Sequence, residues 1–258
     1  MSKSRYVTGL RAVEQLLAVQ DAEVRRIYAE YQTANPRVEA LIAEANNRGI
    51  EVQPANRARL AQISGESRHQ GIVAEVRRST LLDEAGLRTL VEERLQSGDG
   101  RKLLLLLLDG VQDPHNLGAC LRTADAAGAD AVVVPRHGAA GLGPTVSKVA
   151  AGAAESLPYA SVANLGRVLG WLKDYGVAVL GTSDRASQTL YEAALDRPLA
   201  LVMGNEHTGL GKRIESLCDE LISLPMQGSV SSLNVSVATG IFLYEINRQR
   251  LASLAGQG

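Results

Sequence analysis

Asn116 and Arg122 stand out in the stretch LDGVQDPHNLGACLRTADAAGAD (108–130), which follows a run of leucines. The pattern predicts a strand, a polar loop and a helix, which is the usual geometry of a binding site. Each residue also has a purely structural interpretation. Asn116 can be the N-cap of the helix, and Arg122 can pair with Asp125 three residues on. The loop lacks the glycine pattern of a nucleotide site, so the role of this amide and this guanidinium is open.

His115 lies beside Asp113 in the same loop. Together they suggest either a metal site or an acid–base pair. Zinc and iron sites need several such ligands, and only one histidine lies in this stretch. We therefore expect no metal here.

A second polar loop, GNEHTGLGK (204–212), carries Glu206. It resembles a phosphate-binding loop only superficially. Glu206 stands where that motif requires glycine, and Arg213 replaces the Ser or Thr that would hold magnesium. The glycines can instead let the backbone turn tightly against a ligand. Glu206 can alternatively be a carboxylate at the start of a helix, where the helix dipole favours it.

A third loop, LPMQGSVSSLNVSVATG (224–240), places Ser232 and Asn234 at the start of a predicted helix. Such residues are ordinary capping material, but the unpaired backbone N–H groups there can also hold an uncharged or zwitterionic ligand. Ser232 is not predicted to be a hydrolase nucleophile, because the sequence has no G-x-S-x-G elbow. No G-x-G-x-x-G follows a strand, which disfavours a Rossmann dinucleotide site.

Alternating apolar strands and helices must position these loops. In residues 101–258 the predicted strands are LLLLLLD, DAVVVP, VAVLGTSD, LALVMGNE and ELISLPM. The predicted helices are LGACLRTADAAGA, VSKVAAGAAE, ANLGRVLGWLKDYG, LGKRIESLCD and LNVSVATGIFLYEINRQR. This alternation predicts an α/β domain whose mostly parallel sheet is covered on both faces. Ligands bind such sheets at the carboxyl ends of the strands.

Residues 1–77 predict a smaller α/β unit. In it the helices LRAVEQLLAV and RVEALIAEANNRG alternate with the strands VRRIYAEY, IEVQPA and HQGIVAEVR. The charged segment 78–100 predicts a linker that includes a helix. Residues 101–258 then form the larger second domain.

Composition is typical of a soluble globular protein, with 45% hydrophobic and 21% charged residues. No apolar run approaches the ~20 residues of a membrane span, and the N-terminal segment lacks the apolar core of a signal peptide. Cys120 and Cys218 are therefore expected to be reduced thiols in the cytoplasm. Residues 1–76 hold ten Lys and Arg against nine Asp and Glu, and the net charge is -1, so charge does not indicate a nucleic-acid partner.

Three stretches together resemble the signature motifs of the SpoU (TrmH-type) family of RNA ribose 2'-O-methyltransferases. The first motif is LDGVQDPHNLGACLRTADAAGAD, the second is LALVMGNEHTGL, and the third is LPMQGSVSSLNVSVATGIFLYE. They stand in the family order and frame residues 103 to about 250. VTGLRAVEQLL and HQGIVAEV resemble the family's small substrate-binding domain.

The resemblance implies a catalytic α/β domain whose C-terminal part forms a trefoil knot, which general folding rules would never suggest. It implies S-adenosylmethionine as the cofactor, held by backbone groups of the second and third motifs. The positions that match are Gly204, Leu224, Met226 and Leu233, with Thr182 as a weaker candidate. It also implies a homodimer with the knot at the interface. It implies no metal cofactor and no membrane partner.

The catalytic positions that match the family are Asn116, Arg122, Glu206, Ser232 and Asn234. The implied reaction is methyl transfer to a ribose 2'-hydroxyl, which must lose its proton as the bond forms. Family proposals make the arginine the base, but a guanidinium is essentially never deprotonated in proteins. We expect Arg122 to orient an RNA phosphate and stabilise the developing alkoxide. Asn116 would position the ribose, while Glu206 and Asn234 would order the loops.

The implied substrate is a guanosine of 23S ribosomal RNA. Two alternatives stay open: a transfer-RNA ribose methyltransferase of the same family, and a catalytically silent RNA-binding module that kept the knot as a dimerisation scaffold. Arg57, Arg59 and Arg68 are candidates to contact RNA, although exposed arginines usually form a solvated face. Asn205, His207 and Thr208 occupy positions where substitution is expected to affect detail only.

Overall fold

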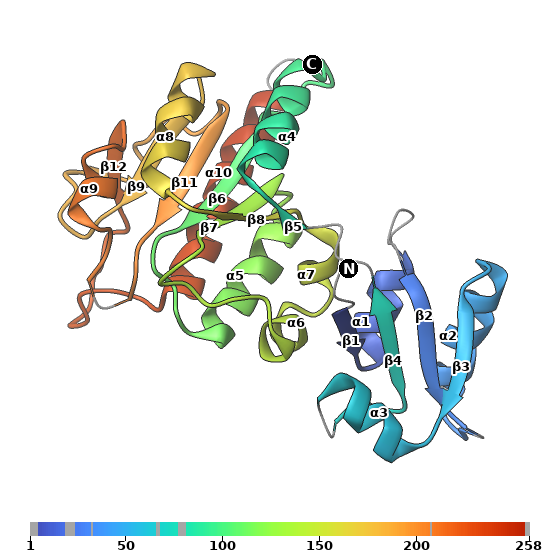
Figure 1. Cartoon of the computed structure of the whole chain (residues 1–258). Coiled ribbons are helices and arrows are strands. Elements are labelled where there is room, and N and C mark those ends of the chain that lie inside the picture. Colours follow the sequence, from blue (N-terminus) through green and yellow to red (C-terminus); the bar gives the residue numbers. More distant parts are fainter. Residues whose placement is uncertain are drawn as a thin grey trace. The chain divides into compact units, whose positions relative to one another are not determined.

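The computed structural model describes residues 5–18, 24–31, 33–65, 68–76, 81–206 and 208–255. The chain divides into two compact units, whose elements are labelled in Figure 1. Unit 1 comprises Met1–Thr80 and Gly141–Ser156, and unit 2 comprises Leu81–Ala140 and Leu157–Gly258. Within the described ranges, no helix is long and apolar enough to cross a membrane.

Unit 1 contains a mixed four-stranded sheet in the order β1-β4-β2-β3. β4 is antiparallel to both of its neighbours, and β2 is parallel to β3. The strands are β1 (Arg5–Thr8), β2 (Val24–Glu30), β3 (Glu51–Ala55) and β4 (Ile72–Val76). The helices are α1 (Leu10–Ala18), α2 (Pro36–Asn47), α3 (Arg57–Ser64), α6 (Pro144–Ala150) and α7 (Ala153–Ser156).

The sheet of unit 1 carries apolar side chains on both faces. Successive side chains of a strand point to opposite faces, so neighbouring apolar residues enter different cores. Ile27 and Ala29 of β2 pack into one core with α1 and α2, whereas Tyr28 between them packs with Leu60 of α3 in another. α2 and α3 each begin where an asparagine side chain accepts a backbone N–H, namely Asn35 and Asn56.

Unit 2 is built on an eight-stranded sheet in the order β10-β12-β9-β11-β6-β7-β8-β5, and every pairing in it is parallel. The mostly parallel sheet that the sequence predicts is thus confirmed. The strands are β5 (Leu81–Leu82), β6 (Leu104–Leu108), β7 (Ala131–Pro135), β8 (Tyr159–Val162), β9 (Ala178–Thr182), β10 (Gln188–Thr189), β11 (Leu199–Met203) and β12 (Glu220–Ser223).

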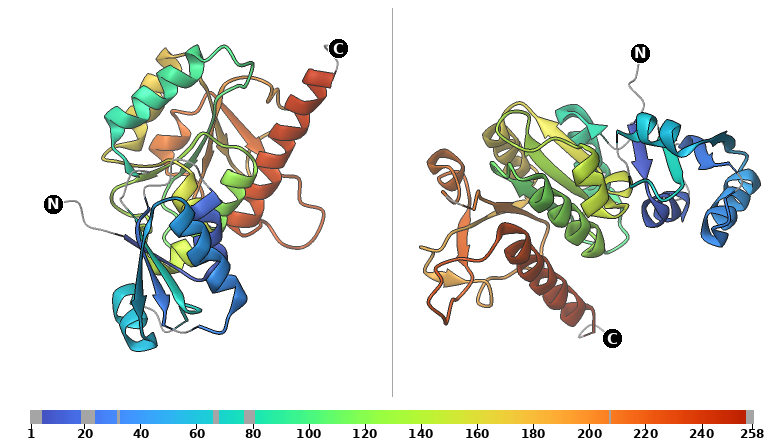
Figure 2. Two further views of the ribbon diagram at one scale, coloured as in Figure 1. Left: turned by 90° about the vertical axis from the view of Figure 1, so that its right-hand side faces the viewer. Right: turned by 90° about the horizontal axis from the view of Figure 1, so that it is seen from below.

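Helices cover both faces of this sheet, as the continuous apolar strands require. α4 and α8 lie on one side, and α5 with α10 lies on the other (Figure 2, left). Leu105 and Leu107 of β6 pack in the same core as Val91 of α4 and Leu169 of α8. The helices are α4 (Glu84–Gln96), α5 (Pro114–Ala126), α8 (Leu165–Asp174), α9 (Lys212–Glu215) and α10 (Val235–Ala255).

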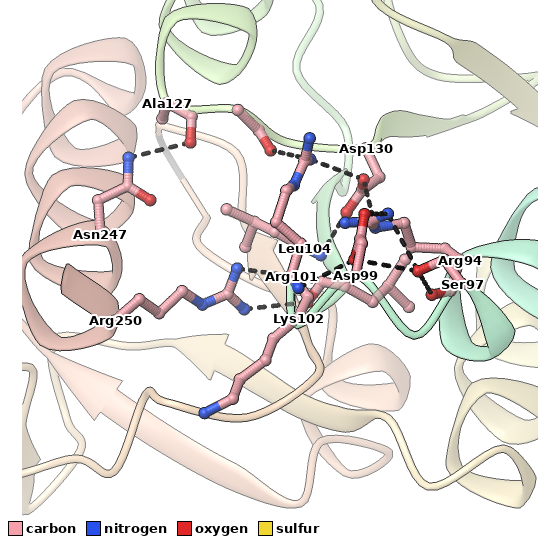
Figure 3. Close-up of polar contacts among 12 residues, drawn as sticks. Arg94, Ser97, Asp99, Arg101, Lys102, Leu104, Ala127, Asp130, Asn247 and Arg250 are labelled. Carbon is pink, nitrogen blue, oxygen red and sulfur yellow. Dashed lines mark hydrogen bonds and ion pairs between the residues drawn. The ribbon is translucent and has the colours of Figure 1, made fainter. Parts of the chain in front are cut away.

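Polar contacts fix the start of β6 between α4 and α10 (Figure 3). Arg250 of α10 donates to the carbonyl oxygens of Lys102 and Leu103 at 2.9 and 3.0 Å. Asp130 accepts the Leu104 N–H at 2.8 Å and pairs with Arg94 of α4 at 3.2 Å. The last helix is therefore tied to the central strand by hydrogen bonds as well as by apolar packing.

Some predicted elements differ from the observed ones. The stretch VSKVAAGAAE forms two short helices rather than one, because Ala151 and Gly152 adopt φ of 52° and 103°. The helix predicted in LGKRIESLCD is only four residues long. The segment 81–96, predicted to be linker with a helix, forms β5 and α4, and Leu87 and Val91 of α4 are fully buried in the core of unit 2.

Both cysteines are free thiols. Cys120 lies on α5, and Cys218 follows α9 rather than lying in a helix as its pattern suggested. Burial raises the thiol pKa of each to about 12. Both are therefore held in the neutral, unreactive form at physiological pH.

Candidate functional site

The three motifs meet at the carboxyl edge of the parallel sheet. β6 and β11 are neighbours, but from β6 the sheet continues to β7 on one side, and from β11 it continues to β9 on the other. Their loops leave the same edge where the strand order reverses, which is the preferred ligand position in such folds. The first motif follows β6, the second follows β11, and the third follows β12.

The first and second motifs are joined by backbone and side-chain hydrogen bonds. Asn205 Nδ2 donates to the Gly110 carbonyl at 2.7 Å, and Gly211 N–H donates to Asp109 Oδ2 at 3.0 Å. Asn205 and Gly209 also bond each other, so the loop folds back on itself. A Cβ atom at Gly204 would lie 2.2 Å from the Gly209 carbonyl carbon, so only glycine fits there. Asn205 therefore holds two motifs together, which is a larger role than sequence reasoning expected.

A chain of amide and carboxylate groups connects all three motifs. Asn116 Nδ2 donates to Glu206 Oε1, and Asn116 Oδ1 accepts from Asn234 Nδ2 at 3.0 Å. Asn234 Oδ1 in turn accepts the Ser236 N–H at 2.9 Å, which caps the start of α10. The structure thus brings together three of the five predicted catalytic residues.

Asp113, not Asn116, is the N-cap of α5. Asp113 accepts the His115 N–H at 2.9 Å, and Pro114 occupies the first helical position. The capping interpretation of Asn116 is therefore wrong, and its side chain is left for the contact with Glu206. No group of three or more potential metal ligands occurs among the residues that the structure describes.

A cavity of about 500 Å³ lies beside this network. It is lined by all five predicted cofactor positions and by two of the predicted catalytic residues. These are Thr182, Gly204, Leu224, Met226 and Leu233, together with Glu206 and Ser232. The Thr182 hydroxyl donates to the Val202 carbonyl at 3.2 Å. Asn116, Arg122 and Asn234 do not line the cavity.

Arg122 is exposed on α5, outside this cavity. Among the described residues it makes no hydrogen bond or ion pair, so the bridge to Asp125 that its spacing allows is not formed. The structure does not bring Arg122 into the amide network of its own chain. His207, which sequence reasoning placed at a variable position, lies outside the described residues.

Several cavity residues escaped sequence reasoning. Asp184 and Arg185 follow β9, Lys212 and Glu215 belong to α9, and Phe242 lies on α10. The signals in the sequence were the position of Asp184 at the end of the predicted strand VAVLGTSD and that of Lys212 at the end of the second polar loop. The wall therefore combines charges of both signs with apolar surface, which suits a zwitterionic ligand that also carries an aromatic ring.

Sequence profiles of known families match both units. The profile of the SpoU rRNA Methylase family matches residues 103–244. The chain belongs to this SpoU family. A second profile, RNA 2'-O ribose methyltransferase substrate binding, matches residues 6–82.

Similar SpoU proteins extend over nearly the whole chain. The 23S rRNA (guanosine-2'-O-)-methyltransferase RlmB of Ralstonia nicotianae is 46% identical over 97% of this chain and 98% of its own length. RlmB of Photobacterium profundum is 45% identical over 95% of this chain and 97% of its own length. The crystal structure of the SpoU methyltransferase AviRb from Streptomyces viridochromogenes with the cofactor AdoMet matches at a TM-score of 0.77, with 26% identity, over 96% of this chain and 91% of that chain. The predicted fold class, a small mixed-sheet domain followed by a parallel-sheet SpoU domain, is thereby confirmed, and the knot itself stays a prediction.

Proposed function

We propose that this protein transfers a methyl group from S-adenosylmethionine to the 2'-hydroxyl of a guanosine ribose in 23S ribosomal RNA. The observation that carries the proposal is the hydrogen-bonded network of Asn116, Glu206 and Asn234 beside a cavity at the sheet edge. SpoU relatives that are 45–46% identical along their whole length are named as enzymes of this activity.

The cavity suits the proposed cofactor in size and lining. Its volume of about 500 Å³ falls within the ordinary range of small-molecule sites. Leu224, Met226, Leu233 and Phe242 offer apolar surface for an adenine ring, and Asp184 and Arg185 offer partners for charged groups. S-adenosylmethionine, when bound, supplies an electrophilic methyl group on a sulfonium. The tight turn at Gly204 places backbone groups of the second motif along the cavity wall.

Asn116 is the residue best placed to orient the ribose. Its amide has two hydrogens and two lone pairs, of which Glu206 takes one hydrogen and Asn234 takes one lone pair. One donor and one acceptor site remain for the substrate. Because both existing bonds fix the plane of the amide, the remaining sites have a fixed direction before RNA arrives, and such preorganisation is what catalysis requires.

Arg122 supplies positive charge to the RNA side of the reaction. Its guanidinium stays protonated and offers five donors, which suits a phosphate oxygen and the oxygen that becomes negative as the proton leaves. Its exposure and its lack of partners among the described residues leave it available to the substrate.

A homodimer completes the proposal, and α10 supports it. One face of α10 is buried through Val235, Phe242, Leu243 and Ile246. The opposite face exposes apolar side chains at seven-residue spacing, namely Val237, Tyr244 and Leu251, which are 53%, 56% and 66% exposed. A stripe of exposed apolar side chains along one face of a helix marks a surface that a partner covers. A second copy of the chain on this face would cover it and bring another Arg122 into the assembly.

Arg122→Ala tests the catalytic assignment. We expect turnover to fall by about 100-fold or more, the usual loss when a group that stabilises a developing oxyanion is removed. S-adenosylmethionine binding, measured by calorimetry, should be unchanged, because Arg122 does not line the cavity. Arg122→Lys keeps the charge but loses the bidentate geometry, so an intermediate turnover is expected. Turnover near that of the original chain in Arg122→Ala would refute the role.

The alternatives are separated by two measurements. Failure of the full chain to bind S-adenosylmethionine in the calorimeter would support a silent RNA-binding module instead of an enzyme. Mapping 2'-O-methyl groups in 23S rRNA from a strain that lacks the protein tests the substrate. Loss of one guanosine methyl group is expected, and a missing methyl group in transfer RNA would show the other substrate class.

A further inference from the structure

Unit 1 contains a cavity of about 860 Å³ to which the three catalytic motifs contribute no residue. It lies at one end of the sheet, where β2 ends, β4 begins and α3 starts. Glu30 is the last residue of β2, Arg57 is the first of α3, and His69 and Gln70 precede β4. All lining residues belong to unit 1, so the cavity is complete within that unit.

His69 is a buried donor at this cavity, with 5% of its surface exposed. Residues 69–72 form a tight turn in which Gln70 and Gly71 have φ of 53° and 82° and Ile72 N–H donates to the His69 carbonyl at 3.1 Å. The Gly71 N–H donates to His69 Nδ1 at 3.1 Å. In a neutral imidazole the remaining hydrogen is therefore on Nε2, and no described group accepts it. Positive φ at a residue other than glycine is a strain that functional sites often hold.

Glu30 and Arg57 add an acceptor and a cation. Arg57 Nε donates to Glu30 Oε1 at 2.7 Å, and the side chains are 79% and 24% exposed, respectively. This contact uses one of the five guanidinium hydrogens, so the other four point to solvent or to a ligand. Between these polar groups, Ala58 and Ala61 of α3 form a wall of small apolar side chains.

We propose that this cavity binds the guanine base of an unpaired nucleotide in the RNA substrate. The Glu30 carboxylate would accept from the adjacent N1–H and N2–H groups of guanine, and His69 Nε2–H would donate to O6 or N7. Arg57 at the rim would contact the phosphate of the same nucleotide. Proteins read single-stranded RNA in this way, by hydrogen bonds to the edges of splayed-out bases.

This site would add base selectivity to the general attraction of unit 1 for RNA. Unit 1 holds 13 Lys and Arg against 10 Asp and Glu, and this modest positive charge attracts phosphates without regard to sequence. Selection of one base requires a shaped pocket with directed hydrogen bonds. The inference rests on the proposed function only in taking the ligand to be RNA.

Binding of short single-stranded RNA to the full chain tests the inference. The probes are labelled oligouridines that differ only in one central base, read by fluorescence anisotropy without cofactor. The probe with a central guanine should bind about tenfold more tightly than those with adenine, cytosine or uracil, as expected for hydrogen bonds to a charged group. Equal affinity for all four probes would overturn the inference.

Three variants locate the effect. Ala61→Leu fills the cavity while keeping a good helix former in α3, so the guanine preference should disappear while oligouridine binding persists. Arg57→Ala should weaken the guanine probe about tenfold. Arg59→Ala is the matched control, because it removes the same charge from the same helix but its side chain contacts Gln62 and does not line the cavity. Any loss of affinity in Arg59→Ala should be equal for all four probes, so that the preference for guanine persists. A guanine preference that survives in Ala61→Leu, with the thermal unfolding of the chain unchanged, would also refute the site.

Failure here is distinguishable from failure of the proposed function. The guanine preference is measured without S-adenosylmethionine and without turnover, so it can hold even if no methyl group is transferred. If the enzyme assignment holds as well, Ala61→Leu should raise KM for ribosomal RNA and leave kcat unchanged. The affinity for S-adenosylmethionine should be the same in Ala61→Leu as in the original chain, because the two cavities share no residue.

Discussion

Asp113 and Asn116 show how one residue frees another for chemistry. Both are good helix caps, and both stand at the start of α5. Pro114 decides between them, because proline is favoured at the first helical position and so sets the cap at the residue before it. The sequence contained this signal. Since Asp113 caps the helix, Asn116 lies inside the first turn, where its amide reaches Glu206 and Asn234.

Asn116→Asp tests whether this amide acts in the reaction. The substitution keeps the size of the side chain but removes the donor and places a carboxylate against Glu206. We expect turnover to fall at least about 100-fold with little change in S-adenosylmethionine affinity, measured by single-turnover methylation and calorimetry. Asp113→Asn is the control, because asparagine caps as well as aspartate. An equal loss of turnover in Asp113→Asn would show that helix position, not the Asn116 amide, limits the reaction.

Residues within the motifs could be predicted from the sequence, and the rest of the cavity could not. Gly204, Leu224 and Met226, which the family resemblance assigns to the cofactor, line the cavity, and their contact with the cofactor stays a prediction. Asp184 and Arg185 line it only because β9 and β11 are adjacent in the sheet. That adjacency is a property of strand order, which no local pattern encodes.

At the scale of elements, length and apolar character decided what was predictable. β6, β7, β9 and β11 are five residues long and mainly apolar, and each was predicted. β5 and β10 have two residues each and exist only by pairing with a neighbour. The break between α6 and α7 depends on close packing, since a Cβ atom at Gly152 would lie 2.2 Å from Gln15 Oε1.

The connection from α4 to β6 should respond to acid. Asp99 accepts from Arg94 at 2.7 Å and from the Arg101 N–H at 3.0 Å, which lowers its pKa to about 2 (Figure 3). A carboxyl whose pKa is lower in the folded state than in the unfolded state stabilises the folded state. This stabilisation is fully present at pH values above the unfolded-state pKa, which is about 4 for aspartate. That contribution is lost as the pH falls towards 2.

Asp99→Asn measures this contribution. The variant should unfold at a lower temperature than the original chain at neutral pH, and the difference should shrink as the pH falls from about 4 to about 2. Asp174→Asn on α8 is the control, because among the described residues Asp174 has no basic side-chain partner. Thermal unfolding followed by circular dichroism gives both values. If the difference in unfolding temperature between Asp99→Asn and the original chain did not change with pH, the charge of Asp99 would not contribute to stability.

At the scale of the molecule, the sequence predicted two α/β parts but not how the chain is shared between them. The boundaries at 77 and 101 were placed by composition, whereas contacts group 141–156 with the first unit and 81–96 with the second. A trefoil knot cannot be predicted from local sequence patterns at all, because it depends on the order in which whole segments pass one another. Family resemblance was the only route to that prediction.

The exposed face of α10 gives the test of assembly. Tyr244→Asp would place a charge in the middle of the proposed dimer interface, where an unpaired buried charge raises the dissociation constant by about 100-fold or more. Light scattering after size exclusion should give twice the mass of the chain for the original protein and once the mass for the variant. Tyr31→Asp changes a tyrosine of unit 1 that is 65% exposed, against 56% for Tyr244, and this variant should remain dimeric. A dimer that persists in Tyr244→Asp would place the interface elsewhere.

The monomeric variant would also separate cofactor binding from methyl transfer. The cavity at the sheet edge is lined by residues of one chain, so S-adenosylmethionine should still bind to the monomer. Arg122 lies outside that cavity and has no partner among the described residues of its own chain. If the partner subunit is needed to bring an arginine to the ribose, methyl transfer should be lost while cofactor binding remains. Retention of both in a verified monomer would mean that each chain acts alone, and that Arg122 must reach the ribose of its own site.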